Sequence, residues 1–308
     1  MEYRFGDLAI ACTHVERVMF PDAGITKGDV IAYYDHVAPL MLPELRRRPL
    51  TIERYTKGVD QGGFFMKHWQ KHYPAWIDSI EIAGKTRVRY PLCDAPAALV
   101  YFANQGGVAM HVMASRADAI ENPDVIVFDL DPPEKRFDLV RSAALVLRDL
   151  LPPLGLPAFV KTTGSKGLHV CVPIDGRSSY EDVHQLCTAV AKLVCRTHGE
   201  LFTVEFYKKD RKGRLYFDTG RNLLGATFIA AYSLRGKPGA PISLPIAWAE
   251  VEDPALAPNG FTLRNIRDRL DRIGDPWATF RAQQGSVTYA LQRFAQLHPE
   301  NESSRSRE

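Results

Sequence analysis

Several features are missing from this 308-residue sequence, and each absence excludes a class of protein. No apolar run approaches the roughly 18 residues that cross a membrane. The first residues include Glu2, Arg4 and Asp7, where a secretory signal has a basic start and then an apolar segment. We therefore expect a cytoplasmic protein without a membrane partner.

The sequence also has little net charge. Its 39 Lys and Arg residues against 36 Asp and Glu residues leave a formal charge of +3 at pH 7. A protein that coats nucleic acid unaided carries a much larger basic excess. The balance argues against that class of protein, although it leaves room for a local basic surface.

Cysteine is scarce and follows no pairing pattern. The five cysteines are an odd number without a Cys-x-x-Cys motif, which fits reduced thiols better than a disulfide framework. Cys187, Cys195 and His198 could indicate a metal cluster. Helical spacing favours a buried apolar stripe instead, formed by Val183, Leu186, Cys187, Val190, Leu193 and Val194.

What is present is typical of a globular protein, with 45% apolar and 24% charged residues. The length suits two domains, or two lobes of one. Apolar patterns alternate between strand and helix, and we expect an α/β or α+β fold. The expected helices are 30–42, a stretch near 97, 138–151 and 180–196, and the expected strands are 50–55, 125–128, 158–161, 168–174 and 214–218.

Three aspartates follow the apolar strands. Asp129 and Asp131 close one run, and on a strand residues i and i+2 lie on one face about 6.5 Å apart. Asp218 ends a later strand in the same way. Converging carboxylates need shifted pKa values or a cation between them, and oxygen ligands favour Mg²⁺ or Mn²⁺. The alternative is three unrelated aspartates that cap helices.

A second motif is the run Lys-Thr-Thr-Gly-Ser-Lys-Gly-Leu-His at 161–169. Small residues, hydroxyls and lysines can surround a phosphate with donors. The run is not a P-loop, because a strand follows it where a P-loop has a helix. The alternative is a tight hairpin, with His169 in the core.

Carboxylates beside a phosphate-binding loop fit two enzyme classes. One is a haloacid-dehalogenase-like phosphatase, and the other is a two-metal nucleotidyltransferase. Pro132 and Pro133 follow the Asp-x-Asp pair where such phosphatases have a small turn, and Gly274-Asp275 lacks a second carboxylate four residues on. A third possibility is a non-catalytic module that binds DNA ends and whose carboxylates are relics.

The segments 125–133, 161–170 and 215–222 resemble, in order and spacing, the three motifs of the archaeo-eukaryotic primase superfamily. The variant is similar to the polymerase domains of bacterial DNA ligase D, which act in non-homologous end joining. The similarity spans about residues 10–280. Further matching stretches are 18–21, 26–28, 48–50, 63–65, 104–106, 230–235 and 274–277.

The resemblance implies mixed central sheets flanked by helices, with an RRM-like catalytic subdomain. It implies one polymerase domain at 1–297, with lobes at about 1–120 and 121–297, and we expect a flexible tail at 298–308. It also implies two Mn²⁺ or Mg²⁺ ions on Asp129, Asp131 and Asp218, and attack of a primer 3′-hydroxyl on an NTP or dNTP, with NTPs preferred. The nucleotide-binding residues would be His111, Thr163, Ser165, Lys166, His169, Arg235 and Lys237.

The same resemblance implies a DNA partner with a 5′-phosphorylated gap or a double-strand break end. Arg17 and Lys27 would bind the 5′-phosphate, and Phe64, Phe65 and Lys67 would contact the template. Arg221 would belong to the basic surface. The 308 residues leave no room for ligase or nuclease domains and contain no Lys-x-Asp-Gly motif. We therefore expect a stand-alone polymerase or an excised domain that works with a separate ligase and a Ku-type protein, near the nucleoid during repair.

Overall fold

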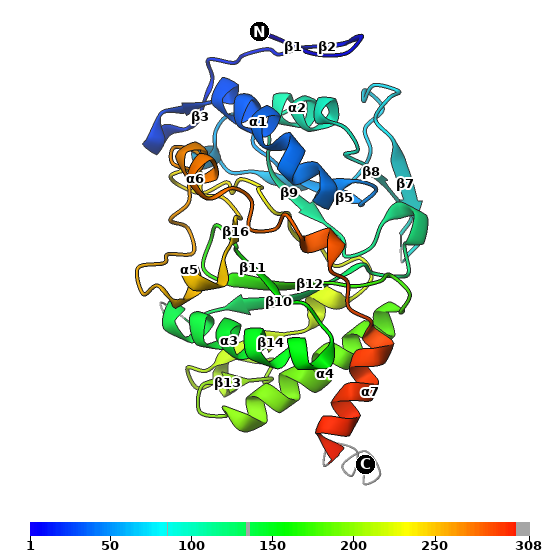
Figure 1. The fold of residues 1–308 in the computed structure, drawn as a ribbon. Helices are drawn as coiled ribbons and strands as arrows, with labels where there is room; N and C mark the ends of the chain where they lie inside the picture. Colours follow the sequence, from blue (N-terminus) through cyan, green and yellow to red (C-terminus); the bar gives the residue numbers. More distant parts are fainter. Residues whose placement is uncertain (85, 134–135, 300–308) are drawn as a thin grey trace.

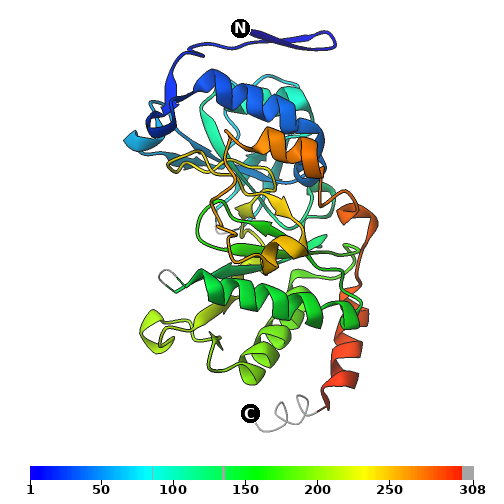
Figure 2. The same cartoon turned by 60° about the vertical axis from the view of Figure 1, so that its left-hand side comes forward.

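The computed structural model describes residues 1–84, 86–133 and 136–299. Its elements form four layers: helices, a four-stranded sheet, a six-stranded sheet and helices again (Figures 1 and 2). A mixed α/β fold with central sheets flanked by helices was expected from the sequence, and it is confirmed. Of the flexible tail predicted at 298–308, residues 300–308 lie outside the described residues.

The four-stranded sheet is antiparallel and has the order β15-β9-β5-β6. Two helices cover its outer face (Figure 1). The elements are α1 (Lys27–Leu45), β5 (Leu50–Arg54), β6 (Phe64–Met66), α2 (Pro96–Asn104), β9 (Gly107–Val112) and β15 (Phe228–Ile229).

Helix α1 is longer than the apolar pattern indicated. It begins after Thr26, which forms a capping box with Asp29. It continues through Pro39 and Pro43 to Leu45, although we expected Pro43 to end it. Burial of the last turn stabilises the helix there, since Leu45 is fully buried and helices in proteins draw most of their stability from packing.

The six-stranded sheet has the order β13-β14-β10-β12-β11-β16, and only the β13–β14 pair is parallel. Helices α3 and α4 pack on its outer face (Figure 1). The elements are β10 (Val125–Asp131), α3 (Phe137–Leu150), β11 (Phe159–Thr162), β12 (Leu168–Pro173), α4 (Tyr180–Thr197), β13 (Phe202–Thr203), β14 (Leu215–Asp218) and β16 (Pro245–Ile246).

Strand alternation sorts β10 between two cores. Ile126, Phe128 and Leu130 pack with α3 and α4 in one hydrophobic cluster, while Val125 and Val127 belong to the other cluster, under the four-stranded sheet. Odd-numbered residues of β10 therefore point toward the four-stranded sheet. The helical stripe predicted on α4 is also buried, which confirms that interpretation of Cys187.

The core beneath α1 and α2 is completed by a late segment of the chain. Its buried residues come mainly from the first 114 positions and from 228–280, including Tyr232, Ile242, Trp277 and Phe280. The chain thus leaves this core to build the six-stranded sheet and then returns to close it.

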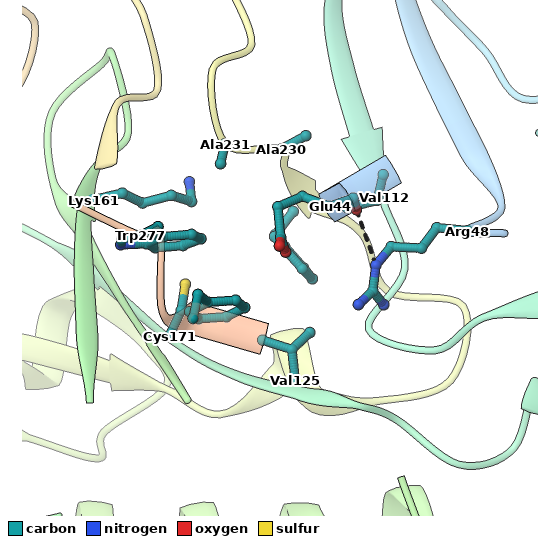
Figure 3. Close-up of a pocket in the computed structure, with 11 residues that line it drawn as sticks. Glu44, Arg48, Val112, Val125, Lys161, Cys171, Ala230, Ala231 and Trp277 are labelled. Carbon is teal, nitrogen blue, oxygen red and sulfur yellow. Dashed lines mark hydrogen bonds between the residues drawn. The ribbon is translucent and has the colours of Figure 1, made fainter. Parts of the chain in front are cut away.

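An ionic network joins the two parts of the fold. Asp124, directly before β10, accepts hydrogen bonds from Arg48, from Arg116 (2.7 Å) and from Arg281 (3.1 Å). Beside it lies a cavity of about 10 Å³, lined by Glu44, Arg48 and Lys161 among apolar side chains (Figure 3). The chain therefore places buried charge, and not only apolar contact, between the two sheets.

The remaining elements are short hairpins and helices around this frame. They are β1 (Glu2–Phe5), β2 (Leu8–Ala11), β3 (Val18–Phe20), β4 (Ile25–Thr26), β7 (Ser79–Ile82), β8 (Val88–Pro91), α5 (Trp248–Glu252), α6 (Ile266–Ile273) and α7 (Val287–Leu297), with 3₁₀ turns at 21–23, 59–61, 117–119, 152–154, 208–210, 220–222 and 280–282. No helix in the described part of the chain is long and apolar enough to cross a membrane.

Candidate active site

One rung of the six-stranded sheet carries the expected carboxylates. In the registers of β14, β10, β12 and β11, Asp218 pairs with Asp129, Asp129 with His169, and His169 with Lys161. Directly paired residues point to the same face of a sheet. All four side chains therefore face the four-stranded sheet, and Asp131 lies on the same face two residues further along β10.

Asp129 is buried and has partners on both carboxylate oxygens. His169 Nε2 lies 3.2 Å from Oδ1, and Arg221 Nε donates to Oδ2 at 2.9 Å. Burial disfavours the charged form, but His169 and Arg221 outweigh it and hold the pKa of Asp129 well below its usual range. Asp129 is therefore ionised at neutral pH.

His169 acts as a neutral donor in this contact. Burial, assisted by the nearby Lys161 charge, lowers the pKa of His169 to about 4. At pH 7 the ring is uncharged, so its bond to Asp129 is a hydrogen bond from Nε2–H. Its buried Nδ1 has no hydrogen-bond partner among the described residues.

The other two carboxylates are more open. Asp131 is exposed at the end of β10, and partial burial of its carboxyl together with the negative charge of Asp129 raises its pKa. Asp218 is half-buried and accepts a bond from the Gly220 backbone N–H at 2.8 Å. These groups retain lone pairs for a cation.

The carboxylates fit a divalent cation in donor type and in backbone placement. Their oxygens are the ligands that Mg²⁺ and Mn²⁺ prefer. Within the described ranges, however, no three His, Cys, Asp or Glu side chains are gathered as ligands around one point. Arg221 accounts for part of this, because its guanidinium occupies Asp129 Oδ2.

The loop between β11 and β12 lies directly against the end of β10. Thr163 closes the loop, because its Oγ1 accepts from Gly167 N–H at 3.1 Å and its own N–H donates to the Gly167 carbonyl at 3.0 Å. A Cβ at Gly167 would lie 2.0 Å from the Leu130 carbonyl oxygen. Glycine is therefore required for this close approach.

Two further cations join that loop from the segment after β15. The Arg235 side chain crosses Gly164, where a Cβ would lie 2.8 Å from Arg235 Cγ. Lys237 Nζ donates to Ser165 Oγ. With the exposed Lys166, these side chains form a positively charged wall beside Asp131, which is the grouping of Ser165, Lys166, Arg235 and Lys237 that the resemblance implied.

The four-stranded sheet contributes His111 from its inner face. His111 on β9 pairs with Thr51 on β5, and its ring lies edge-on to Phe65 with centroids 5.5 Å apart. Burial, and then the charges of Arg235, Lys161 and Arg221, lower the pKa of His111 to about 3. Its buried Nε2 has no bonding partner within the part of the chain that the structure describes.

The aromatic pair on β6 is exposed on both sides of the strand. Phe65 pairs with Glu53 and lies toward His111, whereas Phe64 pairs with Arg54, whose guanidinium lies 5.8 Å from the Phe64 ring centroid. The relative exposures are 50% for Phe64 and 62% for Phe65. Neither ring is a core residue, and Lys67 beyond them is also exposed.

The two cations expected to bind a 5′-phosphate lie together near the β3–β4 hairpin. Lys27 N–H donates to the Arg17 carbonyl at 2.7 Å, and Arg17 NH1 donates to the Thr56 carbonyl at 2.5 Å. Lys27 is buried, its Nζ donates to the Thr13 carbonyl at 2.5 Å, and burial lowers its pKa. Phosphate binding by these residues stays a prediction.

Three residues near the site were not singled out from the sequence. Lys161 is fully buried and donates to Ser243 Oγ at 2.6 Å. Asn222 bonds both backbone groups of Val127 and so fixes the turn that carries Arg221. Glu53 lies on the inner face of β5. Lys161 and Asn222 fall inside the segments 161–170 and 215–222 that carry the resemblance. Nothing in the sequence around Glu53 indicates a site, and only the pairing of β5 with β6 places Glu53 near it.

Several known proteins are similar to this chain. The family model of the LigD primase-polymerase domain matches residues 26–277. The chain is 34% identical over 276 residues to the multifunctional non-homologous end joining protein LigD of Mycobacterium bovis, and 30% identical over 270 residues to the bifunctional LigD of Bacillus subtilis. These alignments cover 86% and 87% of this chain but only 36% and 43% of the relatives.

A solved structure is similar as well. The polymerase domain of Mycobacterium tuberculosis ligase D, determined in complex with DNA, superposes with a TM-score of 0.83 at 31% sequence identity. The match covers 89% of this chain and 99% of that domain.

Proposed function

The chain belongs to the LigD primase-polymerase family, and from this we propose that it is a template-dependent nucleotidyltransferase that extends DNA 3′ ends at gaps and breaks during end joining. The observation that carries the proposal is the shared rung of Asp129 and Asp218, with Asp131 on the same face. Neither the phosphatase nor the non-catalytic module is favoured by the comparisons.

The side chains divide the work of nucleotidyl transfer between them. Asp129, Asp131 and Asp218 would hold two divalent cations, which supply Lewis-acid activation of the primer hydroxyl and neutralise the triphosphate. Lys166, Arg235 and Lys237 would bind the triphosphate through charge-assisted hydrogen bonds. Neutral His169 keeps Asp129 oriented by donating to Oδ1.

The four-stranded sheet would bind the other part of the substrate. His111 faces the same region, and its Nε2, which has no partner among the described residues, can bond a nucleotide hydroxyl or phosphate. The exposed ring of Phe65 beside it can stack on a base without reading its sequence. Arg17 and Lys27 would hold a 5′-phosphate, which would make a gap or broken end the preferred DNA.

The relatives are longer than the part that this chain matches. The relatives are multifunctional or bifunctional end-joining proteins, and the chain spans about 36% to 43% of the length of those compared. We propose that sealing is left to a ligase activity and that a Ku-type protein holds the ends. Sealing and end-holding would thus be functions of partner activities.

The test is primer extension on a 5′-phosphorylated gapped duplex with Mn²⁺ and single NTPs or dNTPs. We expect template-directed addition, faster with NTPs, and loss of at least a hundredfold in Asp129→Ala and Asp218→Ala. Asp138→Ala is the matched control, because Asp138 is an exposed carboxylate at the start of α3.

Three results would contradict the proposal. They are no extension by the parent protein, extension that persists in both aspartate variants, and release of phosphate from small esters that depends on the same aspartates. Far-ultraviolet circular dichroism of each variant would separate loss of chemistry from loss of fold.

A further inference from the structure

A carboxylate, Glu53, lies among the cations that the proposed function assigns to the triphosphate. It belongs to β5, where it pairs with Phe65 of β6 on one side and Ala109 of β9 on the other. Thr51, two residues earlier, pairs with His111. Because side chains alternate along a strand, Glu53 shares the inner face with His111.

Glu53 is held in place by its neighbour on the same face. Tyr55 Oη donates to Glu53 Oε1 at 2.5 Å, and Tyr55 is itself buried. Tyr55 also packs tightly against the segment that carries the cations, since a Cβ at Gly236 would lie 2.0 Å from Tyr55 Oη. The carboxylate is therefore fixed next to the turn between Arg235 and Lys237.

The charges of this group act on one another. Burial lowers the pKa of Arg235, and Glu53 opposes that effect more strongly than Tyr55, Asp129 or Asp131. Glu53 also opposes the burial and cationic neighbours that lower the pKa of Lys237. Among the described residues the Arg235 guanidinium has no hydrogen-bond partner, and the nearby carboxylates of Glu53, Asp129 and Asp131 act on it through space.

We propose that Glu53 is a specificity-determining residue that makes this site select the metal-bound nucleoside triphosphate over the free one. The inference rests on the proposed function, because it assumes that the triphosphate binds beside Arg235 and Lys237.

The physical basis is a match of charge. A free nucleoside triphosphate carries about four negative charges, and one divalent cation reduces this to about two. Lys166, Arg235 and Lys237 offset by Glu53 leave two net positive charges, with Asp131, which also acts on Lys237, counted with the residues that would hold the divalent cation. Without the Glu53 carboxylate the group would attract the free, more highly charged anion more strongly.

Nucleotide binding to the intact protein tests the proposal. Isothermal titration with ATP would be done in EDTA and in Mn²⁺, for the parent and for Glu53→Gln, which keeps an acceptor for Tyr55 while removing the charge. We expect Glu53→Gln to tighten ATP binding about fivefold or more in EDTA and less than twofold in Mn²⁺.

Two matched variants separate charge from structure. Tyr55→Phe removes the hydrogen bond but keeps the Glu53 charge, and Glu81→Gln removes an exposed carboxylate on β7. Neither should tighten binding in EDTA. Equal tightening in either variant, or unchanged or weaker binding in Glu53→Gln, would overturn the inference.

Different results would overturn the role of Glu53 and the proposed function. A parent protein that binds ATP and extends DNA, with a Glu53→Gln variant of equal metal dependence, overturns the role of Glu53 alone. A parent protein that binds no nucleotide in Mn²⁺ overturns the proposed function, and the role of Glu53 with it.

Discussion

Asp129 and Asp218 lie directly opposite each other across the antiparallel β10–β14 pair, although they come from motifs far apart in the sequence. Two carboxylates on one rung repel each other in the absence of a cation. The structure offsets this charge with Arg221, which donates to Asp129 from the turn after β14. The guanidinium and a divalent ion would therefore compete for the same oxygen.

Replacing Arg221 with Met should expose that competition. In metal-free buffer the unfolding free energy of the variant should be about 1–2 kcal/mol lower than that of the parent. A buried hydrogen bond between two charged groups contributes somewhat more than this. Solvent screens the Arg221 bond, because the Arg221 side chain is 42% exposed. Mn²⁺ should then raise the melting temperature of the variant more than that of the parent. Urea unfolding and thermal melts with and without Mn²⁺ measure both effects.

The control for Arg221→Met is Arg136→Met, which breaks an exposed ion pair with Asp138. It should change neither stability nor the response to Mn²⁺ by a measurable amount. An equal Mn²⁺ response in the parent and in Arg221→Met would contradict the competition.

Gly167→Ala should disrupt the contact between the β11–β12 loop and β10. The added Cβ would lie 2.0 Å from the Leu130 carbonyl, so the loop must move away from Asp131. We expect a loss of about 1–3 kcal/mol in stability and a large loss of extension. Gly84→Ala, where a Cβ would make an ordinary contact at 3.7 Å, is the comparison. Wild-type activity in Gly167→Ala would show that the loop position is unimportant.

Lys161→Met should stabilise the protein at neutral pH. Burial lowers the pKa of Lys161 to about 8, from 10.5 in the unfolded chain. Below pH 8 Lys161 is protonated in both the folded and the unfolded chain. Burying its charge then costs up to about 3 kcal/mol of folding free energy, and the hydrogen bond to Ser243 offsets about 1 kcal/mol of that cost. Between pH 8 and 10.5 the unfolded chain binds more protons, so the parent gains stability as pH rises.

The stability difference between Lys161→Met and the parent should therefore be largest below pH 8 and shrink toward pH 10.5. Urea unfolding at pH 7 and pH 9.5 measures it, and Lys192→Met at an exposed position of α4 is the matched control. A constant difference at both pH values would argue against a buried charged lysine.

Phe65→Ala should weaken template binding without affecting the fold. The ring is 62% exposed, so stability should change by less than about 0.5 kcal/mol. Loss of base stacking should weaken DNA binding by about 1–3 kcal/mol. Fluorescence anisotropy with a labelled gapped duplex measures the affinity. Phe64→Ala should have the smaller effect, because that ring lies on the Arg54 side of β6, and the reverse order would contradict the assignment.

Local patterns in the sequence were enough to place most elements. The expected helix at 180–196 is α4 (Tyr180–Thr197), and the expected strand at 168–174 is β12 (Leu168–Pro173). Both have strong apolar periodicity and clear ends, such as the Ser179 capping box. Helix α1 differed because packing of its last turn, which no local signal reveals, outweighed Pro43.

The candidate catalytic rung of Asp129 and Asp218 was predictable only in part. Alternation along β10 places Asp129 and Asp131 on one face, but the register that puts Asp218 opposite Asp129 depends on long-range pairing. The same is true of Arg221, which we expected on a DNA-binding surface and which the structure places against Asp129. No local pattern indicates Glu53, because its relation to Arg235 joins two distant segments of the chain.

The late return of the chain has a consequence for its synthesis. The core beneath α1 and α2 includes Trp277 and Phe280, so a nascent chain cannot complete this core until these residues have left the ribosome. The two halves of the site would then come together in one late event. A fragment ending near residue 120 should accordingly aggregate, whatever its own content of helix and strand.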